Sequence, residues 1–163
     1  MEIPKGFRVG STPPPFPKTG DLVLFRGRGP IAWLIRTWTR SAWDHCGVIW
    51  VVEGEAMVLE ARYRQGVSCH ALRNRMEDVP TVYPTGRAAN VPIALRHLGD
   101  RYSVKDAIRA GLGKRGDHAG WECAEFAAMV LGLDHAARGW TPQGLVTFLV
   151  TPTPPKTGEI GEN

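Results

Sequence analysis

The chain has 163 residues, of which 43% are hydrophobic and 22% are charged, and it carries a formal net charge of +4. This length suits one domain with a substantial core, and this balance excludes an intrinsically disordered chain. The three cysteines, Cys46, Cys69 and Cys123, form no CxxC pair, which argues against a disulfide framework and against a zinc ribbon. We therefore expect free thiols in a reducing compartment, where one of them can be reactive.

The N-terminal segment lacks the apolar core of a signal peptide, and no apolar run approaches the roughly 18 residues that a membrane-spanning helix needs. We expect a protein without a transmembrane segment that is cytoplasmic as synthesised and of bacterial or phage origin, with delivery to the envelope left open. The mild positive charge favours anionic partners only weakly, because Lys and Arg form no long run. No specific nucleic-acid partner is expected, and the oligomeric state is not indicated.

Proline-rich segments flank the central region. Residues 1–19 contain five prolines, and residues 151–163 have a similar character. Both segments are expected to be extended, poorly ordered arms around a single domain at residues 20–150.

Within the domain, the hydrophobic pattern changes from strands to helices. Two apolar runs around Glu53-Gly54 predict a β-hairpin, and Thr141-Pro142 predicts the start of a helix. Period-2 and helical patterns give the remaining elements. In chain order we expect a strand at 21–25, a helix at 31–41, strands at 45–52, 56–61, 67–72 and 78–83, and helices at 103–112, 121–131 and 141–150. This order predicts an α+β fold with a central antiparallel sheet packed against helices.

Cys123 is the thiol best placed for chemistry. It lies two residues into the apolar helix expected at 121–131 and follows a glycine-rich stretch at 113–120. The unpaired N–H groups and the dipole of a helix N-terminus favour a thiolate and can hold an oxyanion. Burial as an ordinary core cysteine is the alternative, because free cysteine is among the most buried residue types. Cys46, inside an apolar strand, and Cys69, in mid-strand, fit a structural role better.

His45 and Glu60 form a second candidate pair. His45 begins the strand at 45–52, and Glu60 closes an apolar run on the next strand. If the turn lies at Glu53-Gly54, both residues lie at the open end of the hairpin, where a carboxylate can orient an imidazole. A surface histidine and an edge-strand charge that blocks aggregation are the alternatives.

Other binding chemistry has little support in the sequence. The remaining histidines show no metal-binding spacing, and no phosphate-binding loop of the Walker type appears. We therefore expect neither a cofactor nor a metal site.

The segments GDLVLF, DHCGVIWV, VLEARYRQGV and WECAEFAAMVLGL follow one another between about residue 20 and residue 150. In this order they resemble the circularly permuted NlpC/P60 branch of papain-like cysteine hydrolases. That branch includes YiiX-like hydrolases and is related to lecithin:retinol acyltransferase-like enzymes. The resemblance implies a papain-like fold with Cys123 as nucleophile, His45 as base and Glu60 as the residue that orients the base. Two positions depart from the family pattern: Glu122 replaces a tyrosine before the nucleophile, and Ala124 replaces a serine after it.

The resemblance implies a cysteine hydrolase that cleaves an amide or ester bond through a thioester. A peptidase or amidase acting on cell-wall peptides is one interpretation. A lipid or thioester hydrolase, or an acyltransferase, is a second, and it suits a Trp-rich, apolar entrance. A non-catalytic binding module that retains the fold is a third.

Overall fold

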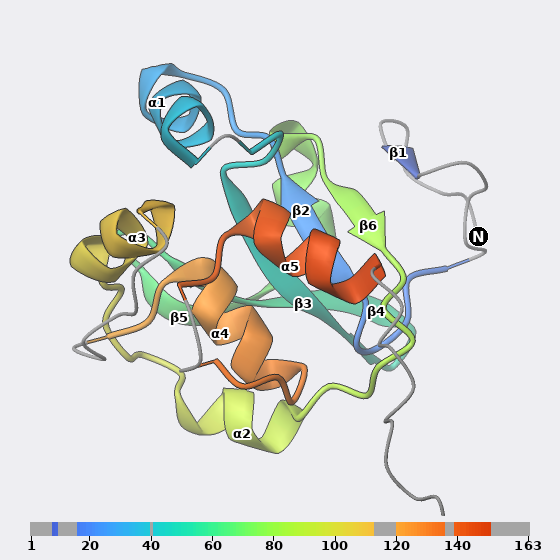
Figure 1. Ribbon diagram of the computed structural model, residues 1–163. Helices are drawn as coiled ribbons and strands as arrows, with labels where there is room; N and C mark the ends of the chain where they lie inside the picture. Colours follow the sequence, from blue (N-terminus) through green and yellow to red (C-terminus); the bar gives the residue numbers. More distant parts are fainter. Residues whose placement is uncertain (1–7, 10–15, 40, 113–119, 136–138, 151–163) are drawn as a thin grey trace, which may run out of the picture.

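The computed structural model describes residues 8–9, 16–39, 41–112, 120–135 and 139–150. Figure 1 shows how the elements are arranged. The strands are β1 (Arg8–Val9), β2 (Leu22–Phe25), β3 (His45–Val52), β4 (Glu55–Arg62), β5 (Gly66–Ala71) and β6 (Thr81–Tyr83). The helices are α1 (Pro30–Thr39), the 3-10 helix η1 (Leu72–Asp78), α2 (Val91–Arg96), α3 (Val104–Gly111), α4 (Cys123–Val130) and α5 (Pro142–Val150).

Within the described residues, the strands form one sheet in the order β1-β6-β2-β3-β4-β5. Strands β2 to β6 pair antiparallel, and β1 adds a short parallel pairing with β6. The predicted α+β class, with an antiparallel sheet packed against helices, is therefore confirmed.

The β3–β4 hairpin turns at Glu53 and Gly54, which both have positive φ (50° and 78°). Two consecutive residues of positive φ are typical of the tight turn that matches the twist of a two-stranded ribbon. Val52 pairs with Glu55 and Val48 with Leu59, so the hairpin has the turn that the sequence predicted.

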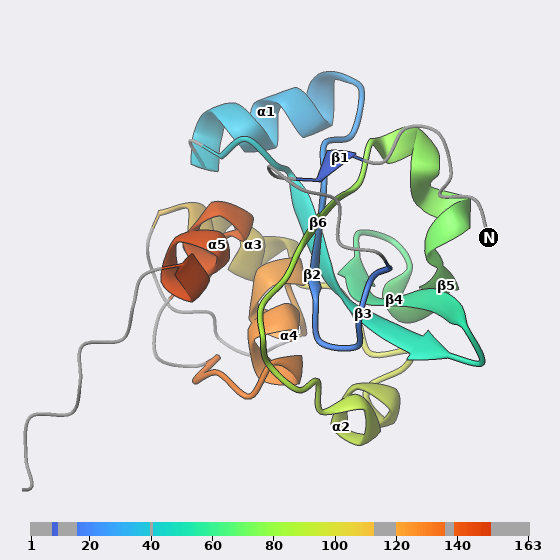
Figure 2. The same ribbon diagram turned by 90° about the vertical axis from the view of Figure 1, so that its right-hand side faces the viewer.

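Alternate residues of the strands face two different cores. Leu22, Cys46 and Val48 point toward α4, whereas Val23 and Ile49 pack on the opposite face, which carries η1. Figure 2 shows α3, α4 and α5 on one side of the sheet. Every residue of α4 is buried, which explains why its sequence has no polar stripe.

The boundaries of several elements differ from the prediction. The strand expected at 78–83 is shortened to β6, because the segment before it forms η1. Helix α2 was not expected; its first turn is capped by Asn90, which accepts a hydrogen bond from the Ile93 N–H at 3.3 Å. The pair Arg8–Val9 lies in β1, within the proline-rich arm, while the rest of that arm to residue 15 and the tail from residue 151 lie outside the described residues.

The predicted helix caps are present in two places. The Ser103 hydroxyl accepts from the Asp106 N–H at 3.1 Å, and the Thr141 hydroxyl accepts from the Gly144 N–H at 3.0 Å. Among the helices that the structure describes, none is long and apolar enough to cross a membrane.

Candidate active site

The β3–β4 hairpin brings His45 and Glu60 together. The register that pairs Val48 with Leu59 continues toward the open end, so His45 and Glu60 become diagonal neighbours on one face. Nε2 of His45 lies 2.7 Å from Oε2 of Glu60. Gly47 permits this approach, because a Cβ there would lie 2.7 Å from Cγ1 of Val58 and 3.1 Å from Cβ of Glu60.

Arg75 of η1 holds the other side of the Glu60 carboxylate. Its Nη1 lies 2.5 Å from Oε1 and 2.6 Å from Oε2 of Glu60, and its Nε donates to Asp78 at 2.8 Å. Both Glu60 and Arg75 are buried. Nothing in the sequence points to Arg75, because it lies in the polar segment LRNRMED, which shows neither helical nor strand periodicity.

His45 and Arg75 lower the pKa of Glu60. Burial alone would raise its pKa, but the hydrogen bond to His45 and the charges of His45 and Arg75 lower it to about 2. Glu60 is therefore a carboxylate at neutral pH and can accept a hydrogen bond from a protonated ring nitrogen of His45.

Phe25 supports the same arrangement from β2. Its ring stacks on the His45 ring with centroids 5.6 Å apart, and the Arg75 guanidinium lies 4.2 Å from the Phe25 centroid. The imidazole is therefore held by a ring as well as by a carboxylate, which restricts its rotation.

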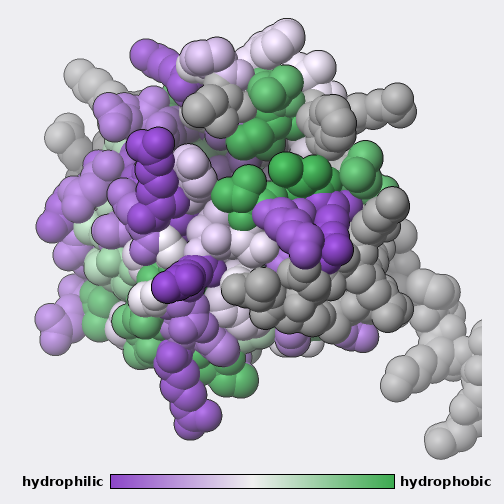
Figure 3. Space-filling model, turned by 90° about the vertical axis from the view of Figure 1, so that its left-hand side faces the viewer, coloured by the Kyte–Doolittle hydropathy of each residue, from purple (hydrophilic) through white to green (hydrophobic). Residues whose placement is uncertain are grey.

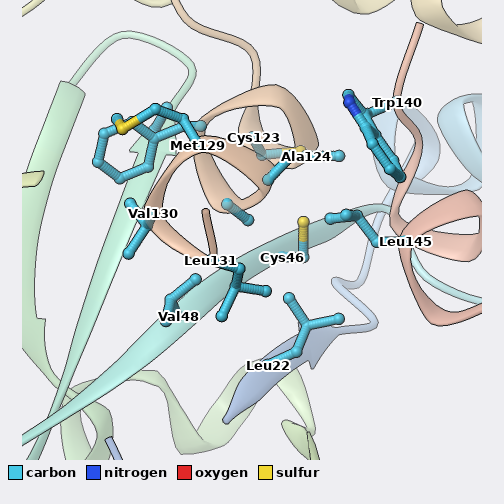
Figure 4. Packing of buried hydrophobic residues seen from close by; sticks show 14 of the residues in the cluster. Leu22, Cys46, Val48, Cys123, Ala124, Met129, Val130, Leu131, Trp140 and Leu145 are labelled. Atoms are coloured by element: carbon cyan, nitrogen blue, oxygen red, sulfur yellow. The ribbon is translucent and has the colours of Figure 1, made fainter. Parts of the chain in front are cut away.

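Cys123 is the first residue of α4, where the helix begins beside the sheet. Two residues before Cys123, Trp121 forms a parallel β-bridge with Tyr102, and the Trp121 backbone N–H donates to the Arg101 carbonyl at 2.9 Å. Figure 4 shows Cys46 on β3 below the N-terminal end of α4, where Cys123 lies. The helix start is therefore anchored on both sides of the thiol.

Two neighbouring groups and burial influence the pKa of Cys123. The Cys46 thiol is hydrogen-bonded to it and has the largest effect; burial acts in the opposite direction, and the His45 ring adds a hydrogen bond and a positive charge. Together they hold the pKa of Cys123 well below its ordinary value. Burial raises the pKa of Cys46, and the Cys123 sulfur raises it further, so Cys46 remains the protonated donor.

The pKa of His45 is shifted in the opposite direction to that of Cys123. Burial alone would lower its pKa, but hydrogen bonds to Cys123 and Glu60 raise it to about 9. The two shifts act together, since the lowered pKa of Cys123 favours a thiolate and the raised pKa of His45 favours an imidazolium. The structure places His45 in hydrogen-bond contact with Glu60, and Cys123, whose Sγ lies 3.7 Å from Oε2 of Glu122, is close enough to His45 for the two groups to shift each other's pKa.

Glu122 caps α4 with its side chain. Its carboxyl group accepts from the N–H groups of Ala124, at 3.0 Å, and of Glu125. Burial and the nearby Cys123 sulfur raise the pKa of Glu122 well above its ordinary value.

An apolar cavity of about 480 Å³ opens beside Cys123. One wall comes from Leu34, Ile35 and Thr39 of α1, and another from Val104, Ala107 and Ile108 of α3. The remaining lining residues are Asp44, Tyr63, Tyr102, Glu122, Cys123, Trp140, Thr141 and Pro142. A nucleophilic sulfur in the lining of an apolar cavity suits a substrate that carries an apolar group next to the bond attacked.

The other residues considered for chemistry lie elsewhere. Cys69 is half-buried on β5, and burial raises the pKa of its thiol. His97 pairs with Asp100 at 2.7 Å. Among the described residues, no group of three or more His, Cys, Asp and Glu side chains is placed to hold a metal ion.

No protein-family model matches the chain, and no curated protein matches its sequence. A solved structure does resemble it: metalloprotein yiiX from Escherichia coli O157:H7, DUF1105. The two share 20% sequence identity at a TM-score of 0.54, over 72% of this chain and 68% of the other. The likeness shows a shared fold, and it is consistent with the papain-like arrangement of helix and sheet.

Proposed function

We propose that the protein is a cysteine hydrolase of the permuted NlpC/P60, YiiX-like type, which cleaves an amide or ester bond through a thioester. Cys123 is the nucleophile, His45 is the general base and acid, and Glu60 orients His45. The observation that supports this most is the 2.7 Å contact between His45 and the buried Glu60, next to a Cys123 thiol whose pKa is lowered by Cys46 and His45 and which lines an apolar cavity.

The chemistry follows from the protonation states. The Cys123 thiolate attacks the carbonyl carbon, and the bond electrons move to the carbonyl oxygen. Because the carboxyl of Glu122 occupies the N–H groups of Ala124 and Glu125, the Cys123 N–H is the first-turn donor that we assign to the oxyanion. His45 then gives its proton to the leaving nitrogen or oxygen as that bond breaks. Water, deprotonated by His45, attacks the thioester and releases the acid and the thiolate.

The cavity lining favours one substrate class. Leu34, Ile35, Val104 and Ile108 offer contacts to hydrocarbon, and they offer no hydrogen bonds to the amide groups of a peptide. We therefore favour a lipid or thioester-type acyl substrate over a cell-wall peptide. An acceptor other than water would make the same intermediate serve as an acyltransferase.

The acyl-enzyme provides the test. Incubation with p-nitrophenyl esters of increasing acyl chain length should give a mass increase equal to the acyl group, located on Cys123 by peptide mass spectrometry. We expect longer acyl chains to react faster, and Cys123→Ala to show no adduct while keeping the thermal unfolding temperature of the wild type. An adduct on Cys46 or Cys69 instead, or no adduct with any chain length, would favour the non-catalytic module.

A further inference from the structure

Two helices beside the cavity leave hydrophobic side chains exposed. On α1, the exposed fractions are 60% for Trp33, 56% for Leu34 and 38% for Ile35. On α3, they are 46% for Val104, 53% for Ile108 and 54% for Leu112, immediately after the helix. We call these six residues the apolar rim. Figure 3 shows hydrophobic side chains gathered on the face that carries α1 and α3.

The apolar rim is continuous with the cavity. Leu34, Ile35, Val104 and Ile108 belong to the rim and also line the cavity, so the exposed surface leads inward to Cys123. Val104, Ile108 and Leu112 follow a spacing of four, which places them along one side of α3. An exposed apolar patch of this kind usually marks a surface that is covered in function.

Charges near the rim indicate what covers it. Arg28 precedes α1, Arg64 follows the cavity residue Tyr63, and Arg101 precedes the cavity residue Tyr102; all three arginines are exposed. Three acidic groups on this side have basic partners: Asp44 lies 2.8 Å from Arg36, Asp100 lies 2.7 Å from His97, and the buried Asp106 lies 3.8 Å from Arg109. Exposed cations around a hydrophobic surface complement anionic headgroups above a hydrocarbon layer.

Two aromatic residues fit the same partner. Trp33 is exposed on α1, and Tyr63, with 57% of its surface exposed, contacts Tyr102 at the cavity. Indole and phenol rings prefer the boundary between headgroups and acyl chains, because one end of each ring is apolar and the other is polar.

We propose that the apolar rim docks on an anionic phospholipid bilayer, with α1 and α3 inserted at the interface and the cavity opening toward the acyl chains. The protein then takes its acyl substrate from the membrane surface. That last step rests on the proposed function, whereas docking itself does not require turnover.

Vesicle flotation tests the docking. The Cys123→Ala chain, which cannot turn over lipid, is mixed with vesicles of phosphatidylcholine alone or of phosphatidylcholine with phosphatidylglycerol. We expect binding to the mixed vesicles that weakens as salt is added. Leu34→Glu combined with Ile108→Glu should weaken binding at least about tenfold, because two inserted apolar side chains are lost. The matched control is Leu98→Glu, an exposed leucine after α2 that does not line the cavity.

A conservative variant separates docking from misfolding. Vesicles should shift the tryptophan emission of the Cys123→Ala chain to shorter wavelength. Adding Trp33→Phe to that chain should remove most of the shift and leave the thermal unfolding temperature unchanged. Equal binding by the double variant and by Leu98→Glu would overturn the proposal. So would a dimer in solution that the double variant abolishes, since the rim would then be a protein interface. Vesicle binding without an acyl-enzyme on Cys123 would refute the proposed function alone, and an acyl-enzyme without vesicle binding would refute docking alone.

Discussion

The central carboxylate of the site is held from two sides. Glu60 has no exposed surface, and its two oxygens contact His45 and Arg75. A buried carboxylate of this kind is stable only while its partners are present, because an unpaired charge in the interior is costly. Arg75 therefore acts as a positioning residue for Glu60, and through Glu60 it acts on His45.

Removal of Arg75 should destabilise the fold. We expect Arg75→Met to lower the free energy of unfolding by about 3 kcal/mol, because Glu60 loses its nearer guanidinium partner and keeps only Arg62, at 3.9 Å. Urea denaturation of the full chain measures this. Arg73→Met is the matched control: Arg73 lies in the same 3-10 helix and pairs with Glu55 at the surface, with 67% of its side chain exposed. The control should change stability by less than about 1 kcal/mol, and an equal loss in both variants would contradict the role of Arg75.

Part of this site could be predicted from the sequence. His45 and Glu60 could be paired from the hairpin turn, because Glu53-Gly54 fixes which ends of the two strands lie together. Cys123 could be placed at a helix start, but its meeting with His45 was inferred only from a family resemblance. Arg75 and the Cys46 hydrogen bond were not predicted, since both depend on how η1 and α4 pack on opposite faces of the sheet.

At the scale of elements, the β3–β4 hairpin is the part that fixes the geometry. Its two strands approach closely at Gly47, where a Cβ would lie 2.9 Å from the Leu59 carbonyl oxygen. The absence of a side chain at this position lets β4 carry Glu60 to the His45 ring.

Replacement of Gly47 should therefore affect both stability and the site. We expect Gly47→Ala to lower the free energy of unfolding by about 1–3 kcal/mol, because the strands must separate to make room for the methyl group. Thermal and urea unfolding measure the loss. Gly54→Asn is the control, since nothing lies within 4 Å of a Cβ there and asparagine tolerates the positive φ of this turn. If Gly47→Ala is as stable as the control, close strand packing does not position Glu60.

Elements without periodicity were the ones that sequence analysis missed. Helix η1 has i to i+3 geometry over a polar segment, so neither the 3.6-residue nor the two-residue period appears. Helix α2 spans six residues, Val91–Arg96, and is too short for a periodic signal. The longer strands and the buried α4 were predictable because their apolar runs are bounded by glycine.

At the scale of the whole molecule, the site contributes to the dependence of stability on pH. The pKa of Glu60 falls from 4.5 to about 2 on folding, so its contribution is present above pH 4.5 and is lost as the pH falls toward 2. The lowered pKa of Cys123 acts in the same direction, while the pKa of His45, raised from 6.5 to about 9, favours the folded state below pH 6.5.

We therefore expect the free energy of unfolding to fall by up to about 3 kcal/mol between pH 4.5 and 2 through Glu60. Between pH 6.5 and 9 the two groups act in opposite directions, because the contribution of His45 is lost as the pH rises while that of Cys123 is gained. Urea denaturation at a series of pH values measures both regions. Glu60→Gln should have a shallower acid slope, and an unchanged slope would show that Glu60 does not carry this dependence.

The fold as a whole places the Cys123 sulfur beside both the sheet and an apolar cavity. The same arrangement gives the thiol its neighbours, Cys46 and His45, and sets α1 and α3 along the cavity, where the proposed function has its substrate enter. Chemistry and access are thus set by different parts of the molecule, and they can be altered separately by mutation.

The account depends most on Cys123 being a thiolate beside a protonated His45. The direct measurement is the rate of iodoacetamide alkylation of each cysteine as a function of pH, resolved by peptide mass spectrometry. We expect the Cys123 rate to stay nearly constant from about pH 9 to about pH 7, while the Cys69 rate falls about tenfold per pH unit. His45→Ala should make the Cys123 rate fall with pH as the Cys69 rate does. A wild-type Cys123 rate that falls in parallel with that of Cys69, or equal and slow labelling of all three cysteines, would contradict the account.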